Sequence, residues 1–174
     1  MQNKRPFLLI TLTLVIVLVS AGCLEKRGPQ DPDVSMFELY VSDPGGVRVD
    51  DQVYSKGDKV LFVLKYHDVE NFNPIEISTI QYEFSRLKPV DMDVHQGFEL
   101  HGIAFLDNDG NSLDTVTLNP GESVFLSLVI PDMQEKWDEI TARFASNESV
   151  QFELVLKMRD LAVPLQSNEL TVSL

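Results

Sequence analysis

Cys23 is the only thiol in a chain of 174 residues. It directly follows the small residues Ser20, Ala21 and Gly22. A lone cysteine has no partner for a disulfide and cannot by itself build a metal site. Small residues in front of it are typical of a peptidase cleavage point. Cys23 therefore directly follows a candidate cleavage point, and the chain has no second cysteine to pair with it.

An almost unbroken apolar run precedes this cysteine. Lys4 and Arg5 form a basic start, and residues 7–19 are nearly all Leu, Ile, Val and Thr. A basic region, an apolar region and small residues describe a secretory signal. With Cys23 the stretch resembles the lipobox of prokaryotic lipoproteins, in which the cysteine takes a lipid and becomes the new N-terminus. The alternative for residues 6–22 is an uncleaved transmembrane anchor, because about 17 residues is the lower limit for spanning a bilayer.

Composition limits the partners of the remaining chain. Removing 22 of the 174 residues leaves 152, enough for one domain with its own core. The signal carries two basic residues and no acidic one, so the net charge moves from −13 to −15. A chain this acidic repels phosphate backbones. We expect no nucleic-acid partner, and we expect a monomer at the extracytoplasmic side of the cell membrane.

The sequence offers no catalytic constellation. It has no Gly-x-Ser-x-Gly, no His-Glu-x-x-His and no glycine-rich phosphate loop. The acid pairs Asp91/Asp93 and Asp107/Asp109 lie in predicted loops, where solvation is more common than catalysis. The three histidines have no metal-ligand spacing: His67, His95 and His101. We predict a non-enzymatic protein without a cofactor or a metal.

Residues 107–111, Asp-Asn-Asp-Gly-Asn, invite comparison with a calcium loop. A loop of the EF-hand type needs Gly at position 6 and oxygen ligands at positions 1 and 12. With Gly110 at position 6, Phe105 and Val116 occupy those two positions, and neither can bind calcium. The segment is predicted to be a hairpin turn.

Hydrophobic alternation dominates the rest of the chain. Apolar and polar residues alternate in ten segments separated by turns, which predicts strands at 36–41, 47–49, 59–69, 75–87, 98–106, 113–118, 123–130, 150–158, 161–165 and 170–174. In 59–69, Leu61 and Val63 are also apolar, so the middle of this strand is expected to be buried on both faces or covered by a helix. The fold class is predicted to be all-β and mainly antiparallel, an immunoglobulin- or fibronectin-like β-sandwich of about seven to nine strands.

One segment has the period of a helix. Met133, Trp137, Ile140 and Phe144 are spaced four, three and four residues apart, which predicts one helix at about 132–145 that packs these four side chains onto the sandwich. Asp132 with Glu135 suggests a capping box.

Asn147-Glu148-Ser149 follows the predicted helix and is an N-glycosylation sequon. Export would expose Asn147 to the modifying machinery where the organism has it.

Three stretches resemble the group 2 late embryogenesis abundant proteins, that is, the WHy (water stress and hypersensitive response) domain. These are residues 69–84 around Asn73-Pro74, residues 118–123 followed by a strand and the Trp137 helix, and residues 152–172. The resemblance implies a small sandwich with one helix and a non-enzymatic role tied to stress.

A second resemblance leads to a different function. Residues 105–111 followed by 118–122 look like the small sandwiches of the intracellular proteinase inhibitor family. That resemblance implies that an exposed loop such as 107–112 blocks a protease.

The predicted organisation is a lipoprotein signal peptide at 1–22, a lipidated cysteine with a flexible spacer at 23–35, and one β-sandwich domain at 36–174. The predicted role is a binding or stress-protective module held at the membrane by lipid on Cys23. The alternative is an inhibitor-like or adhesion domain that binds an envelope protein.

Overall fold

The computed structural model describes residues 29–78, 82–93, 96–100, 103–144, 147–159, 161 and 163–174. The chain divides into two compact units, Met1–Gln30 and Asp31–Leu174. The predicted signal peptide and Cys23 lie outside the described residues. The second unit contains a short 3₁₀ turn, η1 (Val34–Met36), capped by the Asp33 carboxylate. Val34 and Met36 pack against the core of this unit.

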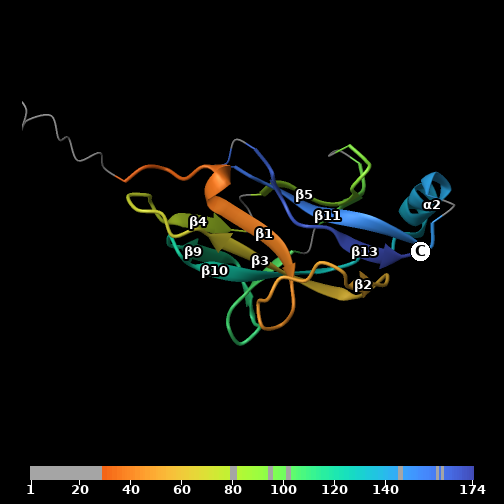
Figure 1. Cartoon of the computed structure of the whole chain (residues 1–174), viewed down its shortest axis with the longest axis horizontal. Coiled ribbons are helices and arrows are strands. Elements are labelled where there is room, and N and C mark those ends of the chain that lie inside the picture. Colours follow the sequence, from red (N-terminus) through yellow and green to blue (C-terminus); the bar gives the residue numbers. More distant parts are fainter. Residues whose placement is uncertain are drawn as a thin grey trace, which may run out of the picture. The chain divides into compact units, whose positions relative to one another are not determined.

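Two large sheets and a separate two-stranded ribbon form the second unit (Figure 1). Sheet 1 is antiparallel, and its strands in spatial order are β1 (Phe37–Ser42), β3 (Lys59–Tyr66), β10 (Ser123–Val129), β7 (Ala104–Leu106) and β8 (Ser112–Leu113). Sheet 2 runs β2 (Val53–Tyr54), β13 (Leu170–Ser173), β11 (Ser149–Met158), β5 (Tyr82–Pro89) and β6 (Phe98–Glu99), with β12 (Leu165–Gln166) also paired to β11. The two-residue β2 pairs parallel to β13, whereas the other pairs in both sheets are antiparallel.

A separate two-stranded ribbon explains why the predicted strand at 75–87 is divided, and the predicted strands at 98–106 and 113–118 are each divided between sheets as well. The alternation over 75–87 predicts a single strand, but the structure has β4 (Ile75–Ser78) paired with β9 (Thr115–Leu118), and then β5 in sheet 2. β4 buries Ile75 and Ile77 in alternation, whereas β5 buries the consecutive residues 87–89, so the strict alternation does not continue through the change of pairing partner.

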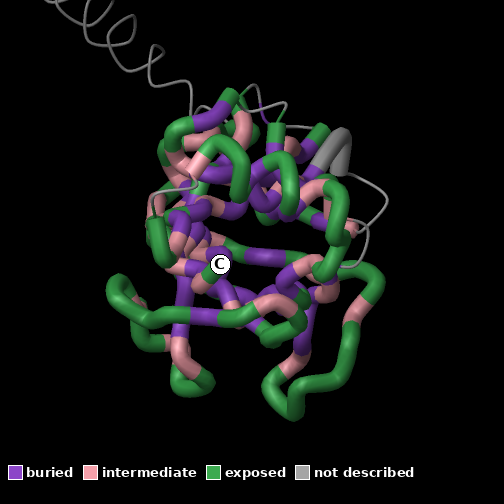
Figure 2. The backbone as a smooth tube through the Cα atoms, turned by 90° about the vertical axis from the view of Figure 1, so that its right-hand side faces the viewer, coloured by how far each residue is buried: buried purple, intermediate pink, exposed green. Residues whose placement is uncertain are grey.

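The core lies between the two sheets. Phe62 and Leu64 of β3 and Phe152 and Leu154 of β11 are completely buried. Figure 2 shows the buried segments of the two layers facing each other. Alternate residues of facing strands meet in this way in β-sandwiches, so the predicted fold class is confirmed.

The only α-helix among the described residues is α2 (Gln134–Arg143), and it confirms half of the predicted stripe. Trp137 and Ile140 are completely buried. Met133 is 60% exposed, so its prediction as a core residue is wrong. The helix begins at Gln134, the residue after Met133. Met133 is the N-cap and has extended backbone angles, which take its side chain off the helical face. Phe144, the C-cap, is only partly buried against the core.

The predicted capping box is also wrong. The N-cap residue is Met133, and it makes no side-chain capping bond. Trp137 holds the helix instead: its indole N–H donates to the Pro131 carbonyl at 2.7 Å. Its ring centroid lies 4.8 Å from that of Phe98 and 5.7 Å from that of Phe152.

Candidate functional site

Sheet 1 carries a second apolar surface on the side that faces away from sheet 2. In register, Tyr40 is opposite Val63, Val63 is opposite Phe125, and Phe125 is opposite Leu106. These residues alternate with the core residues of their strands and therefore face outward. Val63 and Leu106 are nevertheless only 3% and 8% exposed. Something other than sheet 2 must cover this row.

The neighbouring row consists mainly of small residues. Ser42 is opposite Leu61, Leu61 is opposite Ser127, and Ser127 is opposite Ala104. Small side chains on both sides of Leu61 leave space above the sheet. The Ser42 hydroxyl is buried and has no hydrogen-bond partner among the described residues.

Two loops cover the outer side of sheet 1. The connection from β1 to β2 and the hairpin between β7 and β8 both lie on this side, below sheet 1 in Figure 1. The first loop passes closely over Phe125, because a Cβ added at Gly46 would lie 3.3 Å from the phenyl ring. Gly46 has φ +80°, which favours glycine in any case. The Tyr40 hydroxyl donates to the Gly46 carbonyl at 3.4 Å.

An open hollow of about 400 Å³ remains between the two loops. We call it the outer-face groove, and it is lined by Pro44, Lys59, Leu61, Leu106, Asp107, Asn108, Asp109, Gly110 and Phe125. Its floor is the apolar part of β3, β7 and β10, and its walls are the two loops. This volume lies within the range of ligand-binding pockets.

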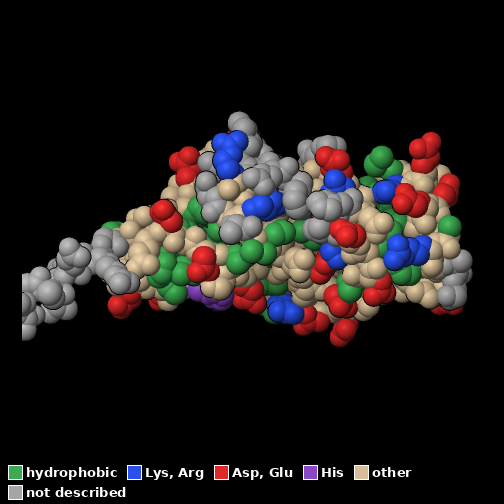
Figure 3. Space-filling view, turned by 90° about the horizontal axis from the view of Figure 1, so that it is seen from above, with side chains coloured by type: hydrophobic (Ala, Val, Ile, Leu, Met, Phe, Trp, Pro, Cys, Tyr) green, Lys and Arg blue, Asp and Glu red, His purple; other side chains and the backbone are tan. Residues whose placement is uncertain are grey.

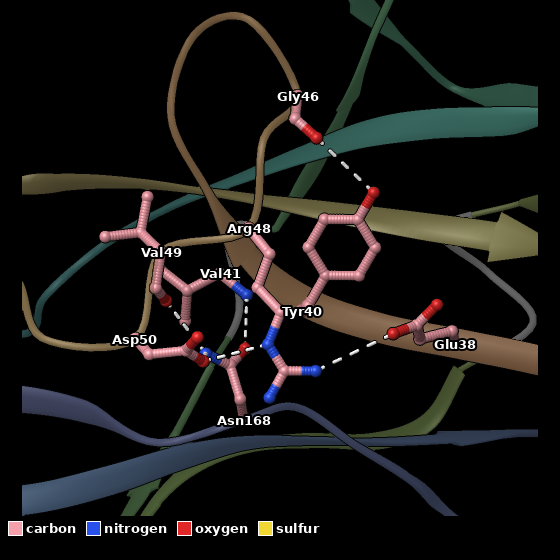
Figure 4. Close-up of polar contacts among 8 residues, drawn as sticks. All are labelled: Glu38, Tyr40, Val41, Gly46, Arg48, Val49, Asp50 and Asn168. Atoms are coloured by element: carbon pink, nitrogen blue, oxygen red, sulfur yellow. Dashed lines mark hydrogen bonds and ion pairs between the residues drawn. The ribbon is translucent and has the colours of Figure 1, made fainter.

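Asn168, in the connection from β12 to β13, fastens the first loop to β1 (Figure 4). Its amide oxygen accepts from the Val41 N–H of β1 at 2.7 Å. Its amide nitrogen donates to the Val49 carbonyl at 2.8 Å and to the Asp50 carboxylate at 2.9 Å. The side chain thus takes the place of a peptide group between β1 and the loop. It satisfies backbone groups that would otherwise lie unpaired at a strand edge.

Arg48 adds ion pairs beside the hydrogen bonds of Asn168. Its guanidinium lies 2.8 Å from the Asp50 carboxylate and 3.7 Å from that of Glu38 (Figure 4). The Arg48 hydrogen bond lowers the pKa of Asp50, and the same bond raises the pKa of Arg48. All three side chains are substantially exposed, so the ion pairs position the loop more than they stabilise the fold.

The second wall, at residues 107–111, is the tight turn predicted from the sequence. The Asp107 carboxylate accepts from the backbone N–H of Asp109 and of Asn111, at 2.9 and 2.8 Å, and from the Asn111 side chain at 2.9 Å. These bonds, led by the Asn111 side chain, lower the pKa of Asp107. Its oxygens serve the turn itself, which agrees with a hairpin and not with a calcium loop.

Two free charges lie in the lining of the groove. Asp109 at the hairpin and Lys59 at the start of β3 are both exposed. Within the described part of the chain, neither side chain makes an ion pair or a hydrogen bond. The groove therefore combines an apolar floor with one available anion and one available cation.

The outer face of sheet 2 and the adjoining helix have a different character. Figure 3 shows basic and acidic side chains interspersed on this side. Lys88 forms an ion pair with Glu153, both largely buried. Arg86 lies 3.9 Å from Glu99, and Lys136 of α2 lies 2.8 Å from Glu139. These three cations are therefore each paired with a carboxylate.

The other residues singled out from the sequence do not gather at one place. Asp91 and Asp93 are exposed, as expected of loop residues. Asn147 is exposed and follows α2, where its backbone N–H donates to the Phe144 carbonyl at 2.8 Å. His67 is half-buried, and His95 and His101 lie outside the described residues. In the described chain, no group of three or more His, Cys, Asp or Glu side chains could hold a metal. None of its helices is both long and apolar enough to cross a bilayer.

The groove residues were missed in the sequence because only strand register brings them together. Leu61 and Val63 were the residues in the sequence that indicated a covered outer face, since they make this face of β3 apolar. The prediction allowed a helix as their cover, whereas the structure covers them with loops.

Comparison with known proteins gives little further information. No family model matches the chain, and no curated protein matches it. One similar solved structure is the N-terminal domain of the Streptococcus gordonii adhesin Sgo0707, at 9% identity and a TM-score of 0.28. The match covers 83% of this chain and 33% of that one, so the chain spans about a third of its length. A similarity this weak carries no functional inference.

Proposed function

We propose that this protein is a non-enzymatic, lipid-anchored binding domain on the extracytoplasmic side of the membrane, and that it holds a partner in the outer-face groove. The observation that carries the proposal is the groove itself. A sheet face that could be polar and solvated is apolar instead, and two loops fastened by side-chain hydrogen bonds surround it. Contiguous apolar surface with a polar rim is typical of interaction sites.

The chemistry of the lining supports binding over catalysis. The groove contains no His, Cys or Ser side chain. Its available ionisable groups are Asp109 and Lys59, and no hydrogen bond joins them among the described residues. Acid–base or nucleophilic catalysis needs such a pair within hydrogen-bond reach.

The location rests on residues 1–23, whose sequence predicts export and lipidation. If Cys23 carries the anchor, the intact mass of the protein isolated from membranes will correspond to a chain that begins at Cys23 with attached lipid. The Cys23→Ser variant will lose processing and membrane retention. An isolated species that keeps residues 1–22 would contradict the anchor without affecting the groove. The stress-protective role implied by the WHy resemblance stays a prediction, because no feature of the described residues bears on it.

Cross-linking in the native cell tests the binding function. The full chain carries p-benzoylphenylalanine in place of Asp109 at the groove or, as the control, in place of Asp114. Asp114 is exposed and lies in the short connection from β8 to β9, outside the groove lining. We expect irradiation to give a defined adduct with an envelope protein from position 109 and not from position 114. No adduct from position 109, or the same adduct from both positions, would overturn the proposal.

A further inference from the structure

We infer that the occupant of the outer-face groove is a peptide segment of a partner protein, with one apolar side chain on the groove floor and a basic residue beside it facing Asp109. This inference rests on the proposed binding function and adds the chemistry of the partner. The floor defines the apolar part of the occupant. Leu61, Leu106 and Phe125 supply only carbon surface, and an inserted apolar side chain would exchange contact with water for contact with this floor.

The rim defines the charges of the occupant. Asp107 and Asp109 both line the hairpin wall, but the Asp107 carboxylate already accepts three hydrogen bonds from its own turn. Asp109 is therefore the carboxylate available to a partner. Lys59, also unpaired within the described residues, is available to an acidic residue on the other flank of the apolar one. Charges at the rim of an interface chiefly decide which partner binds and how fast it associates.

The charge of the whole protein favours a basic segment. The formal net charge of the chain is −13, so its long-range field attracts cations and repels anions. A carboxylate-rich ligand would meet this repulsion together with Asp109. A wholly apolar occupant would leave both rim charges unused.

A peptide titration tests the inference on the full chain as isolated from membranes. The probe is a fluorescent capped peptide, Gly-Lys-Phe-Glu-Gly, and binding is followed by fluorescence anisotropy. Two matched peptides replace Phe by Ser or Lys by Glu. We expect the Ser peptide to bind at least about tenfold more weakly, because the floor loses a buried aromatic contact. We expect the Glu peptide to bind about fivefold more weakly, as for an exposed charge pair replaced by repulsion.

Protein variants place the effect on the groove. Asp109→Lys should weaken binding of the Lys-containing peptide about fivefold and strengthen binding of the Glu-containing one. The substitution should not disturb the turn, because the Asp109 side chain has no ion pair or hydrogen bond among the described residues, and its backbone bond to Asp107 is kept. Asp114→Lys makes the same charge change outside the groove and should leave both affinities unchanged. Equal binding of the three peptides, or equal effects of the two variants, would overturn the inference. If the adduct from position 109 forms while the peptides do not discriminate, the groove binds a partner of different chemistry and only this inference fails.

Discussion

Replacing Trp137 tests whether the core contacts of α2 come from Trp137 and Ile140 or from all four residues at helical spacing. Trp137 is completely buried, packs against two phenylalanine rings and donates a hydrogen bond to a backbone carbonyl. The Lys56 ammonium lies 4.7 Å from the centre of its ring. Truncation to Ala removes all of these contacts and leaves a cavity. We expect Trp137→Ala to lower the free energy of unfolding by about 3–5 kcal/mol.

Met133→Ala is the matched control, because a helical stripe would bury both residues equally. Met133 is 60% exposed, so its truncation should change the free energy of unfolding by no more than about 0.5 kcal/mol. Urea denaturation followed by circular dichroism measures both variants without relying on indole emission. Trp137 is the only tryptophan, so the parent's native fluorescence reports its burial directly. Equal costs for the two truncations, or the emission of a water-exposed indole in the native parent, would refute this account of the helix.

Three further predictions concern the loops and turns. Asn168→Ala should lower the free energy of unfolding, measured by urea denaturation, by about 2–3 kcal/mol, because a buried backbone N–H of β1 loses its acceptor. Asn108→Ala, in an exposed turn, should be nearly neutral, and similar losses for the two variants would show that Asn168 does not hold the loop to β1. Gly97→Ala should lower the free energy of unfolding by more than about 2 kcal/mol, since its Cβ would lie 2.5 Å from a backbone oxygen. Gly57→Ala has a similar φ but open space around it, so it should lower this free energy by about 1 kcal/mol, and equal losses would show that the close approach at Gly97 is absent. The pKa of Asp107 is lowered in the folded state, so the stability that its carboxylate contributes is present above the unfolded pKa and is lost as the pH falls below about 4. The melting temperature of Asp107→Asn should therefore fall less on acidification than that of the parent. Melting temperatures that fall in parallel with pH would refute this.

Local sequence patterns predict the layers of this fold well. Alternation identifies β1, β3, β10 and β11, because each buries one face against the opposite sheet and the alternation is visible along the chain. The two-residue β2 has no period to detect, and it is defined by its parallel partner β13. The prediction that Met133 is buried fails for a related reason, because periodicity selects residues at helical spacing but does not show where the helix begins.

The candidate site depends on information that no local pattern contains. Phe125 and Leu106 are neighbours only because β10 and β7 pair in one register, and a shift by one residue would place them on the other face. The loop over them is held by Asn168, which is 118 residues from Asp50 along the chain. The turn at 107–111 was predictable because all its bonds are local. The groove that this turn completes was not.

A charge placed on the groove floor shows whether the partner occupies the groove. Leu61→Arg places a cation on the floor, and Val129→Arg places the same charge on the same face of sheet 1, where Val129 is 58% exposed and outside the lining. Both variants carry the photo-cross-linker at position 109 and are compared at equal abundance in native membranes. If the partner binds in the groove, Leu61→Arg will lose the adduct and Val129→Arg will keep it. An undiminished adduct in Leu61→Arg would show that the partner does not enter the groove.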